Sequence, residues 1–480
     1  MTAASSSIVQ RYLPWLVGTV LFMETLDSTI VNTAVPAMAR SLEVTPLSLK
    51  AIVTSYILAL AVGIPVSGWL ADRFGTKQLF TAAVGIFTFS SVLCGLSLNS
   101  PMLVAARILQ GLGAAMMTPV GRLAIVRTFP KSQLLDKMNF VIIPALIGPL
   151  LGPTVGGLIV HWWSWREIFF VNVPVGLTAL WMSRRYMPEY RSDSPRPLDV
   201  IGLVLFGSGA ALLSWLLEVF GEHRLDLTSS AILFLLAFAL LGAYGWHANR
   251  TEYPLLNLQL FKGRTFRVSV LGGFITRLGI GGLPFLLPLL YQLGIGMPAW
   301  QSGLMMMPSA IAAMTVKAIS PHLLRRFGYR HVLMVNTVLI GVVIGSFALV
   351  DRHTPLAVIV LMSFLVGSGN SMQFSSMNSL AFADIDARNS SMANTIASSM
   401  QQLSMSFGLA CGSLLTGWYL GGLPQTDQIA VTNALHAAFI TLGIATIVSS
   451  LTFWTLHAED GHALTGQKEA PVATREPVSD

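Results

Sequence analysis

Five charged side chains lie inside otherwise apolar stretches of the sequence, where charges are rare. They are Glu24, Asp27, Arg107, Arg277 and Lys317. A charge at the centre of a bilayer costs roughly 2.5 to 3.5 kcal/mol even on lenient scales, so it normally faces protein or a water-filled cavity. Glu24 and Asp27 are three residues apart and share one helix face. Two carboxyl groups in a low-dielectric setting raise each other's proton affinity, so this pair can bind and release protons.

Asp27 is predicted to be the main protonation site, with Arg107 as its partner. Arg107 would favour the charged form of Asp27 in one state of the molecule and release it in another. Glu24 belongs to the same proton-coupling set, and we place it nearer the outer end of the cavity. A static Asp27–Arg107 ion pair that holds two helices together is the alternative interpretation.

Arg277 and Lys317 give the second half of the chain a positive character. Arg277 lies ten residues beyond Arg267, or about 15 Å along a helix, which places it near the middle of a membrane. Lys317 either faces the cavity or extends to the nearer interface. With no acid in the interior of the later apolar runs, these cations predict an anionic or zwitterionic substrate. We assign both, together with Asn32 and Gln110, to a substrate cavity.

The composition indicates the elements that position these residues. Only 11% of the residues are charged, whereas soluble proteins average about 25%. Apolar runs of about 18 to 25 residues recur, the length a helix needs to cross a bilayer. The sequence therefore predicts an all-α membrane protein with fourteen spans, at 12–36, 48–70, 78–98, 101–124, 138–160, 167–187, 199–220, 229–248, 267–292, 301–323, 332–350, 355–382, 391–419 and 432–457.

The basic residues predict the orientation of these spans. Lys and Arg are concentrated in alternate connections, such as those that hold Arg127 and Arg325, and the intervening connections hold few. The basic connections are therefore expected to be cytoplasmic, with both termini inside. Because the net charge of +7 is spread over six loops, we predict no nucleic-acid partner.

The two ends of the sequence repeat each other at an offset of roughly 252 to 256 residues. Arg73-Phe74-Gly75 falls on Arg326-Phe327-Gly328, and Gly152 falls on Gly408. Such internal symmetry is typical of transporters. The predicted organisation is an N-terminal six-helix half (1–187), a cytoplasmic linker (188–198), an inserted two-helix hairpin (199–248), a C-terminal six-helix half (249–457) and a disordered cytoplasmic tail (458–480).

Five motifs carry a more specific resemblance. They are LDSTIVNTAVP (26–36), GWLADRFGTK (68–77), RILQGLGAA (107–115), GPLLGPTVGG (148–157) and WREIFFVNVPVG (165–176). In this order they resemble the signature motifs of the major facilitator superfamily, and in particular its fourteen-span bacterial drug:proton antiporters. The motifs are dense in the first half, whereas the second half matches mainly in span number and in the degenerate repeat.

The resemblance implies roles for two of these motifs. The 68–77 motif would form a conformational latch between the halves, through Gly68, Asp72, Arg73, Gly75 and Lys77. Its repeat has Arg325 where Asp72 would fall, so the latch is expected on one side only. The 148–157 motif resembles the antiporter motif, and its small residues allow close helix packing. Its members are Gly148, Pro149, Gly152, Pro153, Gly156 and Gly157.

The resemblance implies a multidrug:proton antiporter of the bacterial inner membrane that exports small molecules by alternating access. An exporter of an organic anion or a metal–carboxylate complex is the alternative, followed by an uncoupled carrier or a membrane scaffold. The sequence has no GxxxxGK[ST] or HExxH motif, and its nine histidines are scattered. We therefore predict no enzymatic activity, no metal and no cofactor other than the coupling proton. The expected partners are the substrate and membrane lipid, and the expected functional unit is a monomer.

Overall fold

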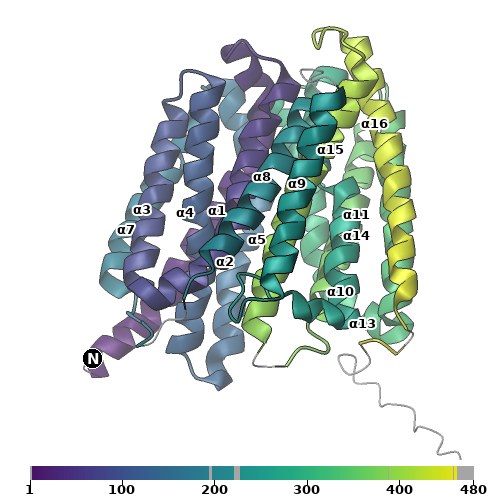
Figure 1. The fold of residues 1–480 in the computed structure, drawn as a ribbon. Coiled ribbons are helices and arrows are strands. Elements are labelled where there is room, and N and C mark those ends of the chain that lie inside the picture. Colours follow the sequence, from purple (N-terminus) through teal and green to yellow (C-terminus); the bar gives the residue numbers. More distant parts are fainter. Residues whose placement is uncertain (1–2, 194–196, 221–226, 387–388, 458, 462–480) are drawn as a thin grey trace, which may run out of the picture.

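The computed structural model describes residues 3–193, 197–220, 227–386, 389–457 and 459–461, and these form a bundle of helices (Figure 1). The α-helices are α1 (Ala3–Ser41), α2 (Lys50–Phe74), α3 (Thr76–Gly95), α4 (Ser100–Thr128), α5 (Lys131–Trp162), α6 (Glu167–Phe170), α7 (Asn172–Tyr186), α8 (Val200–Phe220), α9 (Leu227–Ala248), α10 (Arg264–Arg267), α11 (Gly273–Ile280), α12 (Leu283–Leu289), α13 (Ala299–Ser346), α14 (Leu356–Ala381), α15 (Ser390–Leu420) and α16 (Gln428–Ser449). Short 3-10 or π segments are η1 (Pro46–Leu49), η2 (Leu258–Lys262), η3 (Val268–Gly272), η4 (Leu290–Gly294), η5 (Phe347–Leu349) and η6 (Ser450–Thr455).

The helices account for the fourteen predicted spans. Ten helical stretches in the described part of the chain are long and apolar enough to cross a membrane, and one of them, Ala299–Leu349, contains two predicted spans. The other three predicted spans coincide with α1, with α6 and α7, and with α15. α1 carries two acids, α7 is only 15 residues long, and α15 is rich in Ser and Gln. None of these three stretches is among the ten.

We describe the bundle as a first group of helices, α1 to α7, a second group, α10 to α16, and a hairpin, α8 and α9; α5 packs on α13 and α2 packs on α15 across the groups. In the first group α1 packs on α5, and α4 packs on α2 and α3. In the second, α13 packs on α14 and α16, and α11 packs on α15. α8 and α9 pack on each other, and α8 also contacts α2 and α15, so the hairpin lies beside the junction of the groups (Figure 1). The exact boundaries of the five predicted segments remain predictions.

The repeat is visible in the backbone. α2 and α3 meet at Gly75, with φ 91° and ψ 150°, and the long α13 changes direction at Gly328, with φ 72° and ψ 161°. Both conformations favour glycine because a side chain is strained at positive φ. Gly111 lies against the carbonyl of Tyr56, and Gly367 lies against the carbonyl of Ser309, at corresponding positions of the two halves. The halves therefore share helix contacts as well as sequence pattern.

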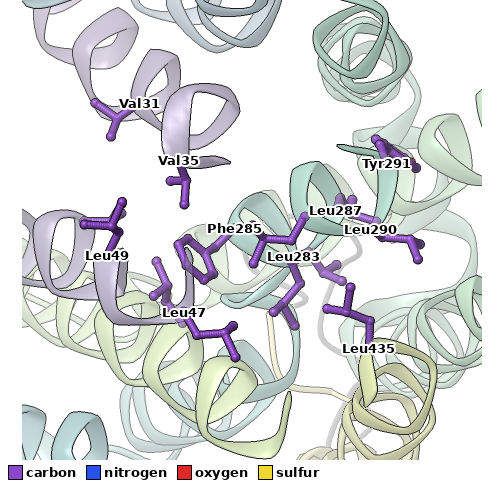
Figure 2. Close-up of a cluster of buried hydrophobic side chains, with 14 of the residues drawn as sticks. Val31, Val35, Leu47, Leu49, Leu283, Phe285, Leu287, Leu290, Tyr291 and Leu435 are labelled. Atoms are coloured by element: carbon purple, nitrogen blue, oxygen red, sulfur yellow. The ribbon is translucent and has the colours of Figure 1, made fainter. Parts of the chain in front are cut away.

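An apolar cluster joins the two groups at the end of the bundle opposite the N-terminus (Figure 2). Val31, Val35 and Leu47 of the first group pack with Phe285 and Leu435 of the second, and all are buried. Gln292 Nε2 donates to the carbonyl of Thr33 at 2.9 Å. The backbone N–H of Leu47 donates to Gln425 Oε1 at 3.1 Å. The two groups are therefore sealed to each other at this end.

The predicted linker is partly bound to the first group. Residues 188–192 lie against the turn between α2 and α3, where the N–H of Thr76 donates to the carbonyl of Tyr190 at 3.0 Å and its hydroxyl donates to the carbonyl of Pro188 at 2.8 Å. The N–H of Ser192 donates to the carbonyl of Asp72. Of the predicted tail, only residues 459–461 are described, and there Asp460 binds Arg264 through two hydrogen bonds, of 3.0 and 2.6 Å. The rest of the predicted tail lies outside the described residues.

Candidate functional site

Asp27 and Arg107 form a completely buried ion pair between α1 and α4. Arg107 Nη1 lies 2.6 Å from Asp27 Oδ2, and neither side chain is exposed. The other carboxylate oxygen of Asp27 accepts from Gln110 Nε2 at 2.9 Å and from Asn172 Nδ2 at 2.7 Å. All three partners donate, so the carboxylate acts only as an acceptor, as an ionised group does. We call Asp27, Arg107, Gln110 and Asn172 the ion-pair network.

The guanidinium of Arg107 is fixed from several sides. Its Nε donates to the carbonyl of Ile52 at 3.2 Å, and Nη1 also donates to Gln110 Oε1 at 2.6 Å. The ring of Tyr56 lies 4.0 Å from the guanidinium carbon, a cation–π contact. Arg107 Nη2 has no hydrogen-bond partner in the described part of the chain. The network therefore retains one unused donor and includes contacts to α2 as well as α1 and α4.

Two members of the network were not predicted in these roles. Asn172 was not singled out, although it belongs to the 165–176 motif. Gln110 was assigned to the substrate cavity, whereas the structure buries it between Asp27, Arg107 and Ser91. Asn32 of the same predicted cavity set is buried too, and its Oδ1 has no hydrogen-bond partner among the described residues. Sequence alone does not distinguish cavity-lining amides from buried ones.

Glu24 contacts α4 on the N-terminal side of the network, and its place at the outer end of the cavity remains a prediction. It accepts a short hydrogen bond from Thr118 of α4, and Arg122 one turn further along α4 is close enough to interact with its charge. α1 begins at the end of the bundle where α4 finishes, so Glu24 lies nearer the N-terminal end than Asp27 does (Figure 1). Arg122 is an intramembrane cation that sequence analysis missed, and its Nε is buried without a partner among the described residues.

Arg277 lies in the second group, on α11, in a small polar pocket. Ser269, Asn378 and Gln401 line the same pocket. The described residues provide no hydrogen bond or ion pair to the Arg277 guanidinium, which lies 6.0 Å from the ring centre of Phe374. Ser269 Oγ is also buried without a partner in that part of the chain. Lys317 is exposed on α13 and does not line this pocket, so the structure does not bring the two predicted cavity cations together.

The predicted latch residues lie at the turn between α2 and α3. Asp72 pairs with Arg127 of α4 at 3.4 Å, within one group, and both side chains are partly exposed. Arg73 is exposed, and Gly68 leaves open space where a side chain would be. Lys77 faces a groove between α3 and α7 instead of pairing with Asp72. A contact between the two groups at this turn remains a prediction.

The predicted antiporter motif forms the main contact between α5 and α1. Gly148, Gly152 and Gly156 lie against Thr25, Thr29 and Ile30 of α1, with no room for a Cβ. α5 continues as one helix through Pro149 and Pro153. On its other side Gly157 lies against the backbone of Ala299, and Gly303 lies against the carbonyl of Pro153. The motif therefore packs α5 on both its own group and the opposite one.

Comparisons with known proteins identify the family. The model of the Major Facilitator Superfamily matches residues 17–409. The chain belongs to this superfamily of transporters. It is 38% identical over 455 residues to a protein of Serratia proteamaculans named "Putative multidrug resistance protein MdtD", with 95% of each chain covered. It is 40% identical over 440 residues to the protein of that name in Pectobacterium atrosepticum, covering 91% of this chain and 93% of the relative.

Solved structures share the fold. A bacterial homologue of the human lysosomal transporter Spinster, in an inward-facing and occupied conformation, matches with a TM-score of 0.68 at 13% identity, covering 96% of this chain and 99% of that one. A D-xylose–proton symporter matches with a TM-score of 0.66 at 15% identity, covering 93% and 98%. The all-helical major facilitator fold predicted from the sequence is thus confirmed. The chain is a multi-pass secondary transporter and not an enzyme.

Proposed function

We propose that this transporter exports small molecules in exchange for protons and that Asp27 carries the coupling proton. The observation that supports this most is the ion-pair network: an acid and a base, both fully buried, joined at 2.6 Å. Removing one partner of such a pair leaves a buried charge uncompensated and costs about 3–5 kcal/mol. Protonation of Asp27 removes its charge, so each proton that binds or leaves changes the balance of forces between α1, α2 and α4.

The positions of the basic loops and of the contacts between the groups support a direction of transport. The basic connections support a topology in a bacterial inner membrane with both termini in the cytoplasm. In that topology the apolar cluster of Figure 2 closes the periplasmic end, which supports an inward-facing interpretation of the structure. In that state Asp27 accepts hydrogen bonds from three donors. Protonation from the periplasmic side in the other state would release Arg107 and allow the halves to return.

Transport by everted membrane vesicles tests the proposal. A respiratory pH gradient is established and a lipophilic cation such as ethidium is added. Vesicles with the wild type should lose part of the gradient, and Asp27→Asn should not, because the asparagine cannot bind a coupling proton. Glu167→Gln is the matched control, since Glu167 is exposed and lies outside the network. A gradient that collapses equally with Asp27→Asn would contradict the assignment.

The relatives' name supports multidrug substrates, and the Arg277 pocket supports a second candidate, an organic anion or a metal–carboxylate complex. A largely buried guanidinium that has no hydrogen bond or ion pair within the described residues is expected to bind an anion, since an uncompensated charge in the membrane is unfavourable. Arg277→Gln and Lys317→Gln separate the candidates. If anionic carboxylates dissipate the gradient and only Arg277→Gln abolishes their effect, the second candidate holds.

Two further outcomes decide whether the protein is a coupled carrier. Saturable transport with counterflow but without proton movement would indicate an uncoupled carrier. If a well-inserted protein moves neither cations nor anions, the scaffold interpretation is favoured. Purified protein studied at low concentration would test the prediction that the monomer is the functional unit.

A further inference from the structure

A groove with a volume of about 540 Å³ opens on the surface of the first group, between α3 and α7. It lies away from the ion-pair network. Its wall on α3 is formed by Lys77, Gln78, Thr81, Ala82 and Gly85, and its wall on α7 by Leu180 and Arg184. Gly85 keeps the groove open because it presents no side chain toward Leu180. Thr81 donates to Ser183 at 3.1 Å and joins the two helices along the groove.

The groove changes character along its length. Ala82, Gly85 and Leu180 make the part nearer the middle of the helices apolar. Lys77 in the first turn of α3 and Arg184 in the last turn of α7 make the other end basic. Neither cation has an ion-pair partner within the described ranges, and Glu189 of the linker closes the end of the groove against Gly75.

Aromatic side chains mark this end as a membrane boundary. Trp181 is exposed on α7, and its ring contacts Tyr186 edge to face. Tyr186 also stacks on Tyr12 of α1, with ring centres 4.6 Å apart. Tryptophan and tyrosine gather at the level of lipid headgroups because their rings are apolar and their polar atoms reach water. Lys77 and Arg184 therefore lie where phospholipid phosphates are found.

We propose that this groove is a binding site for phosphatidylglycerol, an anionic phospholipid with one phosphodiester. The phosphate lies between Lys77 and Arg184, the glycerol hydroxyls donate to the Glu189 carboxylate, and an acyl chain follows Ala82, Gly85 and Leu180. Basic pockets between membrane helices bind acidic headgroups in this manner. The two cations and one acid of the groove carry a net charge of +1, which a singly charged lipid neutralises.

Native mass spectrometry of the detergent-purified transporter tests the site. Phosphatidylglycerol and phosphatidylethanolamine are added at equal concentration, and the retained lipid is counted. The wild type should retain more phosphatidylglycerol. Arg184→Gln should reduce this binding about fivefold, the expected loss for one basic residue near a lipid headgroup. Gly85→Leu should reduce it further, because its side chain occupies the path of the acyl chain.

Two matched variants control for general effects. Arg185→Gln removes the neighbouring exposed cation, which lies over the Tyr186 ring and does not line the groove. Gly242→Leu adds the same side chain to α9, where nothing lies within 4 Å. Both should bind phosphatidylglycerol as the wild type does. Equal retention of the two lipids, or unchanged binding by Arg184→Gln and Gly85→Leu, would overturn the proposal.

Discussion

The two halves of the transporter share a backbone plan but differ in their buried charges. Gly111 and Gly367 make the same approach to a neighbouring helix, and Gly75 and Gly328 share a positive φ at their turns. At the repeat offset, however, Asp27 falls on Gly279 and Arg107 on Ser363. The first half therefore has a complete ion-pair network, and the second half has none at the corresponding place. The two halves therefore share the close helix packing that lets helices move as units, but they do not share the buried charges.

The cations emphasise this difference. In the first half Arg107 is compensated by Asp27 and Arg122 lies near Glu24. In the second half, the described residues that line the pocket around Arg277 are all neutral. A compensated charge suits a proton switch, since protonation changes its balance. An uncompensated one suits a ligand that brings its own charge. We therefore propose that coupling resides in the first half and substrate recognition in the second.

The largest expected effect comes from breaking the ion-pair network on one side only. Arg107→Gln leaves Asp27 buried without its counter-charge and should lower the free energy of unfolding by about 3–5 kcal/mol. The double variant Asp27→Asn/Arg107→Gln removes both charges and should recover most of this loss, while transport stays absent. Thermal unfolding in detergent measures both. If the double variant is no more stable than Arg107→Gln, the pair is not the source of the loss.

A smaller loss of stability, similar in the two halves, is expected when the repeated glycines are substituted. Gly111→Ala and Gly367→Ala each place a Cβ against a backbone carbonyl, of Tyr56 and of Ser309. Both should destabilise the protein by about 1–3 kcal/mol, the usual cost of overpacking. Gly345→Ala is the control, because nothing lies within 4 Å of its Cβ. Similar losses in the unfolding temperature at both sites would strengthen the comparison, and a loss at only one would weaken it.

Glu24→Gln should affect transport less than Asp27→Asn. The glutamine keeps a hydrogen bond to Thr118 but loses the charge that faces Arg122. We expect coupled transport to persist at a reduced rate, because Asp27 still binds the proton. Proton uptake per substrate, measured in vesicles, checks this. If Glu24→Gln abolishes coupling as completely as Asp27→Asn does, the two acids act as one site.

The smallest change in stability is expected for a substitution of Asp460, which binds Arg264 near the end of the described chain. Burial raises the pKa of Asp460, but hydrogen bonds and charge from Arg264 outweigh it and hold the pKa below its usual value. The Asp460–Arg264 ion pair therefore stabilises the folded protein fully at pH values above the pKa of an aspartate in the unfolded chain. This stabilisation is lost as the pH falls through the lower pKa of Asp460 in the folded protein. Asp460→Asn should cost at most about 1 kcal/mol at neutral pH, because Arg264 is partly exposed. The free energies of unfolding of the wild type and the variant should become equal in acid. A difference between them that does not change with pH would contradict the assignment.

The sequence predicted the charged parts of the site better than the neutral parts. Asp27 and Arg107 were paired correctly because charges are rare in apolar helices and need a partner. Asn172, Ser91 and Thr118 could not be found in this way, since neutral polar residues are common in membrane helices and their contacts join distant segments. Arg122 was overlooked because it lies near the end of its predicted span. The fold followed from span lengths and motif order, whereas the contacts of residues 188–192 depend on backbone atoms that carry no sequence signal.

The most direct test of the central claim is proton release on substrate binding. Ethidium is added to purified transporter in weakly buffered detergent solution at a series of starting pH values, and the pH change is recorded. The comparison of the halves predicts release by the wild type and by Arg277→Gln at saturating ethidium, and none by Asp27→Asn. Undiminished release by Asp27→Asn would show that coupling does not reside in the ion-pair network.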